Sequence, residues 1–201
     1  MPEVVIFDYG AGNLLSLKVA LEKVGLNVRI GSNQQTLQKA DAIALPGVGN
    51  FSAASDKLEL LRNDIGDAVK NGIPLLGICL GLQLFFPRSE EGPGRGLALY
   101  QGNNVWLPSS VKVPHMGWNT LQIIKQNAFL DGIDDESYVY FVHSLYPVPD
   151  DKNLICTKTE YGTEFVSCIA DRNVFGTQFH PEKSGATGLK ILENFAKIIK
   201  K

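Results

Sequence analysis

An apolar segment that ends in a cysteine between two glycines constrains the fold of this chain more than any other part of its sequence. The segment 73–78 leads into Cys79, and Gly77 and Gly81 stand close to the cysteine on either side. Glycines at these places allow a strand and a following helix to approach each other around a strained residue. The pattern is typical of a nucleophile elbow, with sulfur in place of oxygen. The sequence therefore predicts a strand, a sharp turn and a helix, with Cys79 as a candidate nucleophile.

The first half of the chain alternates apolar segments with helical periodicity, and the second half is rich in short strand-like segments. Strands that are apolar on both faces are typical of a parallel sheet covered by helices. Gly, Asn and Asp turns separate the later segments, which favours antiparallel pairing there. We therefore expect an α/β fold with a doubly wound, mostly parallel, flavodoxin-like sheet and an antiparallel β extension, in a single domain over 1–201. The expected strands are 4–7, 27–30, 42–45, 73–78, 105–107, 120–124, 138–143, 155–159, 165–169 and 174–179, and the expected helices are 14–24, 52–70 and 187–200.

Composition and charge limit the possible functions. Hydrophobic residues make up 44% of the 201 residues and the formal net charge is −2, so the sequence is globular in character and lacks the basic surface typical of nucleic-acid binding. No apolar run is long enough for a membrane helix, and the chain starts with a strand rather than a signal peptide. Three cysteines without paired spacing indicate a reducing compartment. We therefore expect a cytoplasmic protein that binds neither nucleic acid nor membrane.

A cysteine nucleophile needs a base, and His180 is the best candidate among the three histidines. Side chains two positions apart lie on the same side of an extended segment, so Glu182 is expected to face His180 and to orient its ring. Pro181 between them is expected to keep the backbone extended. Taken alone, a histidine and an acid at this spacing can also be a surface pair. Together with the elbow, they favour a triad of Cys79, His180 and Glu182.

Two backbone amides are candidates for an oxyanion hole. The amide of Leu80 directly follows the nucleophile and is the natural first donor. The glycine-rich loop 46–49 follows another strand of the same sheet, so it could aim a second N–H at a carbonyl oxygen; an ordinary strand-to-helix turn is the alternative. Cys156 and Cys168 lack flanking glycines and are expected to be small core residues, which is also the alternative for Cys79. The three histidines show no metal-ligand spacing, and we expect neither metal nor cofactor.

The residues around Cys79 and His180 resemble the triad-type (class I) glutamine amidotransferases. The resemblance rests on the stretches 77–83 and 179–182, in this order along the chain. Further stretches extend it over essentially the whole chain and point to one branch, the glutaminase subunits of imidazole glycerol phosphate synthase. These stretches are 8–13, 45–49, 114–119, 140–144 and 180–184.

The resemblance implies that Cys79 attacks the side-chain amide of glutamine and forms a glutamyl thioester, with His180 transferring protons and Glu182 orienting His180. It also implies an oxyanion hole made by the amides of Leu80 and Val48. Ammonia would pass to a partner, a (β/α)8-barrel cyclase subunit of a heterodimer in histidine biosynthesis, and glutaminase activity would be low until that partner binds. The residues implied to contact glutamine are Gly47, Gly49, Gln83, His143 and Ser144.

The same resemblance places His115, Trp118, Asn119 and Lys183 toward the side that faces the partner. A satisfied structural histidine for His115, a core aromatic for Trp118 and a solvated lysine for Lys183 are the alternatives. For the whole chain, one alternative is the glutaminase subunit of another ammonia-channelling synthase, such as that of pyridoxal phosphate synthesis. The others are a cysteine peptidase or chaperone-like relative with a similar elbow, and a flavodoxin-like binding module with Cys79 buried.

Overall fold

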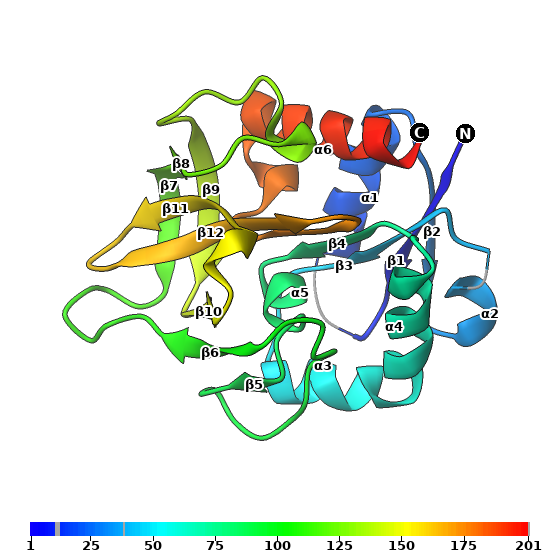
Figure 1. The fold of residues 1–201 in the computed structure, drawn as a ribbon, viewed down its shortest axis with the longest axis horizontal. Helices are drawn as coiled ribbons and strands as arrows, with labels where there is room; N and C mark the ends of the chain where they lie inside the picture. Colours follow the sequence, from blue (N-terminus) through cyan, green and yellow to red (C-terminus); the bar gives the residue numbers. More distant parts are fainter. Residues whose placement is uncertain (11–12, 38, 201) are drawn as a thin grey trace.

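The computed structural model describes residues 1–10, 13–37 and 39–200, and its centre is a large sheet (Figure 1). Within these ranges the sheet has eight strands, in the order β2-β1-β3-β4-β13-β12-β11-β8. The first five run parallel, and β12, β11 and β8 continue the sheet in antiparallel pairing. This arrangement confirms the expected mostly parallel, flavodoxin-like sheet with an antiparallel extension. The strands are β1 (Glu3–Phe7), β2 (Asn27–Gly31), β3 (Ala42–Leu45), β4 (Leu75–Ile78), β8 (Gln122–Ile123), β11 (Ile155–Glu160), β12 (Glu164–Asp171) and β13 (Val174–Thr177).

Two small sheets lie toward the antiparallel end of the large one (Figure 1). One consists of β10 (Leu145–Pro149), β6 (Gly102–Trp106) and β5 (Arg88–Ser89), and the other of β7 (His115–Thr120) and β9 (Tyr138–His143). The sequence does not predict β5, β7 or β10. It also predicts antiparallel pairing in the second half, which is wrong for the contact between β13 and β4, because these two strands pair in parallel. That pairing places the residues that follow β13 beside Cys79, which follows β4.

Helices cover both faces of the large sheet (Figure 1). On one face lie α1 (Leu14–Lys23) and α6 (Gly185–Ile199), and on the other lie α3 (Phe51–Leu58) and α4 (Arg62–Lys70). The turn η1 (Glu59–Leu61) divides the expected helix 52–70 into α3 and α4. In the described ranges, no helix is both long enough and apolar enough to cross a membrane. The short elements are α2 (Gln34–Leu37), α5 (Leu80–Gln83), η2 (Ala128–Leu130), η3 (Lys152–Leu154) and η4 (Pro181–Lys183).

Local sequence signals explain both ends of α1. The side chain of Asn13 accepts a hydrogen bond from the amide of Ser16 and so satisfies one of the free donors in the first turn. Gly25 follows the helix with φ of 80°, a left-handed conformation that glycine adopts without steric cost. Residues 11–12 of the stretch 8–13 lie outside the described ranges.

The turn at Cys79 is packed so tightly that only glycine fits beside it. A Cβ atom on Gly81 would lie 2.1 Å from the carbonyl oxygen of Leu45 in β3, and one on Gly77 would lie 2.5 Å from the ring of Phe85. Both distances are far below van der Waals contact, so a side chain at either position would push α5 away from the sheet. The two glycines therefore let α5 lie directly against the sheet, with Cys79 at the carboxyl end of β4.

We expect Gly81→Ala to lower the free energy of unfolding by about 1–3 kcal/mol, because the new methyl group overlaps the Leu45 carbonyl. Gly66→Ala is the matched control, because Gly66 lies within α4 and a Cβ there meets no atom within 4 Å outside its own helix. Alanine should stabilise that position by about 0.5–1 kcal/mol. Urea unfolding of both variants measures the difference, and equal stability would contradict the packing described for the elbow.

Candidate active site

Cys79 sits in a strained turn at the carboxyl end of β4. Its φ is 50° and its ψ is −104°, a sparsely populated region for a residue with a side chain. Its amide donates a hydrogen bond of 2.6 Å to the carbonyl oxygen of Thr177, the last residue of β13. The sulfur lies 3.6 Å from the carbonyl oxygen of Val142 and 3.4 Å from Nε2 of Gln178. The expected elbow is therefore present, and its sulfur has polar neighbours from two further strand ends.

His180 and Glu182 form a buried pair after the end of β13. Nδ1 of His180 lies 2.8 Å from Oε1 of Glu182, and 2% and 5% of their side chains are exposed. The backbone between them is not extended as expected, because Pro181 opens the 3-10 turn η4, which brings the acid back toward the ring. Ser184 fixes this turn, since its hydroxyl donates to the carbonyl oxygen of His180 and accepts from the amide of Tyr140. The alternative of a surface pair is thus excluded by burial.

The environment of His180 favours its protonated form. Burial alone would lower the pKa of His180, but a thiolate at Cys79 and the carboxylate of Glu182 outweigh burial and raise the pKa to about 9. Nε2 of His180 has no hydrogen-bond partner among the described residues, so it is the ring nitrogen available to Cys79, whose side chain raises this pKa. At neutral pH the ring can therefore hold a proton on the nitrogen that Glu182 leaves free.

The other two histidines are neutral and belong to a hydrogen-bonded chain. Nδ1 of His143 lies 2.9 Å from the carbonyl oxygen of Leu145, and Nε2 of His143 lies 3.0 Å from Nδ1 of His115. The amide of Asn119 lies 3.4 Å from the remaining ring nitrogen of His115. Burial lowers the pKa of His115 to about 4 and that of His143 to about 3. Because the Leu145 carbonyl can only accept, each ring carries its proton on Nδ1, and neither histidine serves as a base for Cys79.

A cavity of about 260 Å³ opens beside the sulfur of Cys79. It is slightly smaller than the pockets of roughly 300–1,000 Å³ that hold drug-sized ligands, so it fits a molecule of amino-acid size. The structure brings together here all the residues predicted for the oxyanion hole and for contact with glutamine, and adds four others. The predicted residues are Gly47, Val48, Gly49, Leu80, Gln83, His143 and Ser144, and the additional ones are Glu91, Pro114, Val142 and Leu145.

The loop 46–49 is held by a side chain at one end and has a backbone conformation that favours glycine at the other. The buried hydroxyl of Tyr9 donates to the carbonyl oxygen of Pro46, and burial together with the nearby charge of Cys79 raises the pKa of Tyr9 well above its ordinary value. Gly49 has φ of 139°, which only glycine adopts readily. Val48 between them is partly exposed. The sequence does not single out Tyr9, although its position two residues after the end of β1 places it at the same sheet edge as Cys79.

The four residues predicted to face a partner divide into two pairs. Trp118 is 55% exposed and packs edge-on against Tyr140, and Nζ of Lys183 lies 6.0 Å from the centre of the same ring. His115 is buried, in agreement with the alternative of a structural histidine, and Asn119 donates to the carbonyl oxygen of Glu160. Trp118 and Lys183 therefore form part of the surface next to His180, whereas His115 and Asn119 support the cavity from within.

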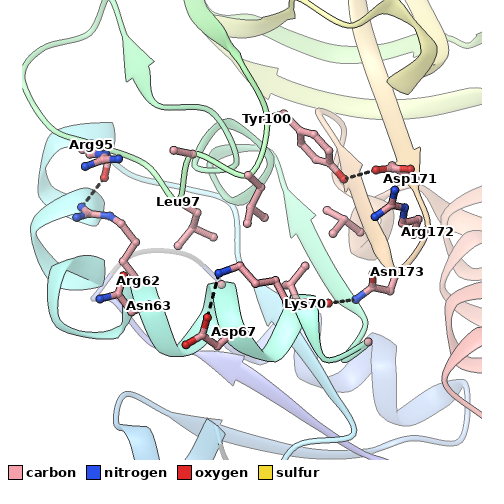
Figure 2. Close-up of a pocket in the computed structure, with 16 residues that line it drawn as sticks. Arg62, Asn63, Asp67, Lys70, Arg95, Leu97, Tyr100, Asp171, Arg172 and Asn173 are labelled. Carbon is pink, nitrogen blue, oxygen red and sulfur yellow. Dashed lines mark hydrogen bonds and ion pairs between the residues drawn. The ribbon is translucent and has the colours of Figure 1, made fainter.

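A larger cavity, of about 670 Å³, lies at the opposite ends of the same strands (Figure 2). Its charged and polar groups are largely paired with one another: Tyr100 donates to Asp171, and Lys70 lies 3.1 Å from Asp67. Arg62 donates to the carbonyl oxygen of Arg95. Because it lies at the amino ends of β4 and β13, and its described lining contains no cysteine, serine or threonine, this cavity is not part of the site at Cys79.

Comparisons with known proteins find relatives over nearly the whole chain. The family model described as "Glutamine amidotransferase class-I" matches residues 5–199. The "Imidazole glycerol phosphate synthase subunit HisH" of Methanocaldococcus jannaschii is 49% identical over 195 residues, which cover 96% of this chain and 98% of the relative. The protein of the same description from Archaeoglobus fulgidus is 48% identical over 200 residues, 98% of this chain and 100% of the relative. A solved structure described as "Structure of PurLQS from Thermotoga maritima" has a TM-score of 0.78 at 19% identity, covers 98% of both chains and shows a likeness of fold alone.

We expect the ring of His180 to titrate near pH 9 in NMR spectra, and Glu182→Gln to lower that midpoint, because the carboxylate stabilises the protonated ring. The pKa is raised above the unfolded value of about 6.5, so the stabilisation is fully present below that pH and is lost as the pH rises through 9. Glu182→Gln should therefore destabilise the protein more at pH 6 than at pH 10. A midpoint near 6.5 in the unmodified protein would contradict the described environment.

Proposed function

The chain belongs to the class-I glutamine amidotransferase family, and we propose that Cys79, His180 and Glu182 are its catalytic residues. Its function is that of the glutaminase subunit of imidazole glycerol phosphate synthase, the enzyme named for its near full-length relatives. The choice of these three residues rests mainly on the parallel pairing of β4 with β13. This pairing supports the triad because it brings Cys79 and the His180–Glu182 pair to the same end of adjacent strands.

In the proposed first step, the thiolate of Cys79 attacks the side-chain carbonyl carbon of glutamine in the cavity of about 260 Å³. The carbonyl oxygen becomes negatively charged and accepts hydrogen bonds from the amides of Leu80 and Val48. Leu80 directly follows the nucleophile and Val48 lies in the loop that Tyr9 anchors, and both residues line this cavity, which supports their proposed role. The loop can reorient at Gly49, which supports the expectation that activity is low until a partner orders it.

His180 then gives the proton on Nε2 to the leaving nitrogen, and ammonia departs as the thioester forms on Cys79. The neutral ring takes a proton from water, whose oxygen attacks the thioester carbon and releases glutamate. The raised pKa of His180 suits the first of these roles, because the ring carries its proton at neutral pH. Glu182 holds Nδ1 throughout and stabilises the charged ring, a role supported by the 2.8 Å contact.

We propose that ammonia passes to a (β/α)8-barrel cyclase subunit, and that this partner docks over β7, β9 and the first half of α1. Met116, Trp118 and Tyr138 lie on one face of the paired strands β7 and β9, and each is more than half exposed. Leu15 and Val19 are exposed one turn apart on α1 and line a groove that reaches Glu182. Clustered exposed apolar side chains are typical of protein interfaces, and this cluster lies next to the proposed triad.

We further propose that the chain forms a single domain and is located in the cytoplasm. The family match over residues 5–199 supports a single glutamine amidotransferase domain over 1–201. All three cysteines are free thiols, which supports a cytoplasmic location because cytoplasmic thiols are kept reduced.

We expect Cys79→Ala, assayed with the partner subunit, to abolish glutamine hydrolysis while synthesis from added ammonia continues at the normal rate, because only ammonia production needs the thiolate. Cys168→Ala is the control, since Cys168 is buried in β12 and has no proposed role in catalysis. Glutamate release and product formation from ammonia measure the two activities. Glutamine use by Cys79→Ala at the normal rate would show that another residue is the nucleophile.

We expect Trp118→Ala to weaken binding of the cyclase subunit at least ~10-fold, because large aromatic residues contribute much of the energy of interfaces. Trp106→Ala is the matched control: Trp106 is 46% exposed, but it lies on β6, away from the proposed surface. Isothermal titration calorimetry with the cyclase subunit measures both affinities. An equal loss in the two variants, or none in Trp118→Ala, would place the interface elsewhere.

A further inference from the structure

Gln178 is a fully buried glutamine whose side chain contacts the sulfur of Cys79. Its Nε2 lies 3.4 Å from Sγ, and its Oε1 accepts a hydrogen bond of 3.2 Å from Nε2 of Gln83. The backbone amide of Gln178 donates to the carbonyl oxygen of Ser167 in the neighbouring strand, and this bond fixes the backbone from which the side chain projects. The contact with sulfur is therefore a built feature of the core rather than a chance approach of a mobile side chain.

The backbone carbonyl of Leu145 determines, through Gln83, which end of the Gln178 side-chain amide faces the sulfur. The carbonyl oxygen of Leu145 can only accept, and Nε2 of Gln83 donates to it at 2.9 Å. The second hydrogen on that nitrogen points to Oε1 of Gln178. If the amide of Gln178 were turned around, two NH2 groups would face each other and both would lose a bond. Gln178 therefore presents an N–H donor, and not its oxygen, to Cys79.

A donor at this place matters when the sulfur loses its proton. As a thiol, Cys79 can donate to the carbonyl oxygen of Val142, 3.6 Å away. When the proton moves from Sγ to Nε2 of His180, sulfur becomes an acceptor and the Val142 oxygen becomes an unfavourable neighbour. The N–H of Gln178 then gains strength, because hydrogen bonds to charged acceptors are about twice as strong as those between neutral groups.

We propose that Gln178 is a further catalytic residue, whose amide N–H binds the Cys79 thiolate and stabilises it for attack. This proposal rests on the proposed role of Cys79 as the nucleophile. The proton that leaves sulfur goes to His180, so the step creates one negative and one positive charge inside the site. Gln178 stabilises the negative charge without adding a charge or taking up a proton itself.

Apart from His180, the titratable side chains described around Cys79 do not stabilise its thiolate. Tyr9 keeps its proton because burial raises its pKa well above the ordinary value, and His143 is neutral. Glu91 lines the same cavity and accepts from the amide of Phe51, and any charge on it opposes the thiolate. Glu182 is occupied with His180. Apart from His180, the neutral donor on Gln178 is thus the side chain in the described part of the chain that favours the thiolate at the sulfur.

The test is the pH dependence of Cys79 alkylation by iodoacetamide in the complete synthase, followed by peptide mass mapping. In Gln178→Met, a side chain of similar length without a donor, we expect the midpoint of the profile to move up by about one unit, with roughly tenfold slower alkylation below it. Gln178→Glu should move the midpoint up further, because it places an acceptor at the sulfur. Gln101→Leu, at an exposed position, is the control and should match the unmodified protein.

Glutamine hydrolysis should fall in both Gln178 variants through kcat, with KM little changed, because Gln178 acts on the nucleophile rather than on substrate binding. Urea unfolding of each variant establishes that it is folded. A folded Gln178→Met with an unchanged alkylation profile would overturn the proposal. If Cys79→Ala still hydrolysed glutamine, the role of Cys79 would be wrong, but the shifted profiles would still report the contact with Gln178, so the two failures are distinguishable.

Discussion

The position of the Cys79 sulfur depends on the close contact between the elbow and the strands beside it. A backbone with φ of 50° costs a residue other than glycine about 1–3 kcal/mol, and it persists only where the surroundings leave no alternative. Here Gly81 packs against the Leu45 carbonyl, and the Cys79 amide is bound to Thr177. The same contacts that impose the strain therefore place the sulfur next to Gln178 and next to the cavity proposed to bind glutamine.

Two polar systems meet at that sulfur, and they differ in charge. On one side, His180 is paired with Glu182 and has a pKa raised to about 9, so its ring holds a proton at neutral pH. On the other side, burial keeps His143 neutral. The side chains of His143 and Gln83 both donate to the carbonyl oxygen of Leu145, which fixes their orientation. In the proposed mechanism, the charged pair on one side of the site moves protons, and the neutral donors on the other side hold the nucleophile and the substrate in fixed positions.

The sequence predicts the parallel core and the triad because both depend on local patterns: apolar strands, glycines around Cys79 and a histidine two residues before an acid. It fails where distant contacts decide the structure. The strand β10 contains Pro147, which argues against a strand but is tolerated because β10 lies at a sheet edge. Gln178 carries no local signal, because its partner lies 99 residues away and only the pairing of β13 with β4 brings them together. His180 and Glu182 meet as expected, but through a 3-10 turn that begins at Pro181.

In the proposed mechanism, the strained turn makes Cys79, and not another thiol, the group that attacks glutamine. Labelling of the complete synthase with a chloroketone analogue of glutamine, followed by peptide mapping, tests this role of Cys79. The structure predicts one label per chain, on Cys79, with loss of glutaminase activity in proportion to labelling and protection by added glutamine. Labelling of Cys156, Cys168 or a residue other than cysteine, with the same loss of activity, would contradict it.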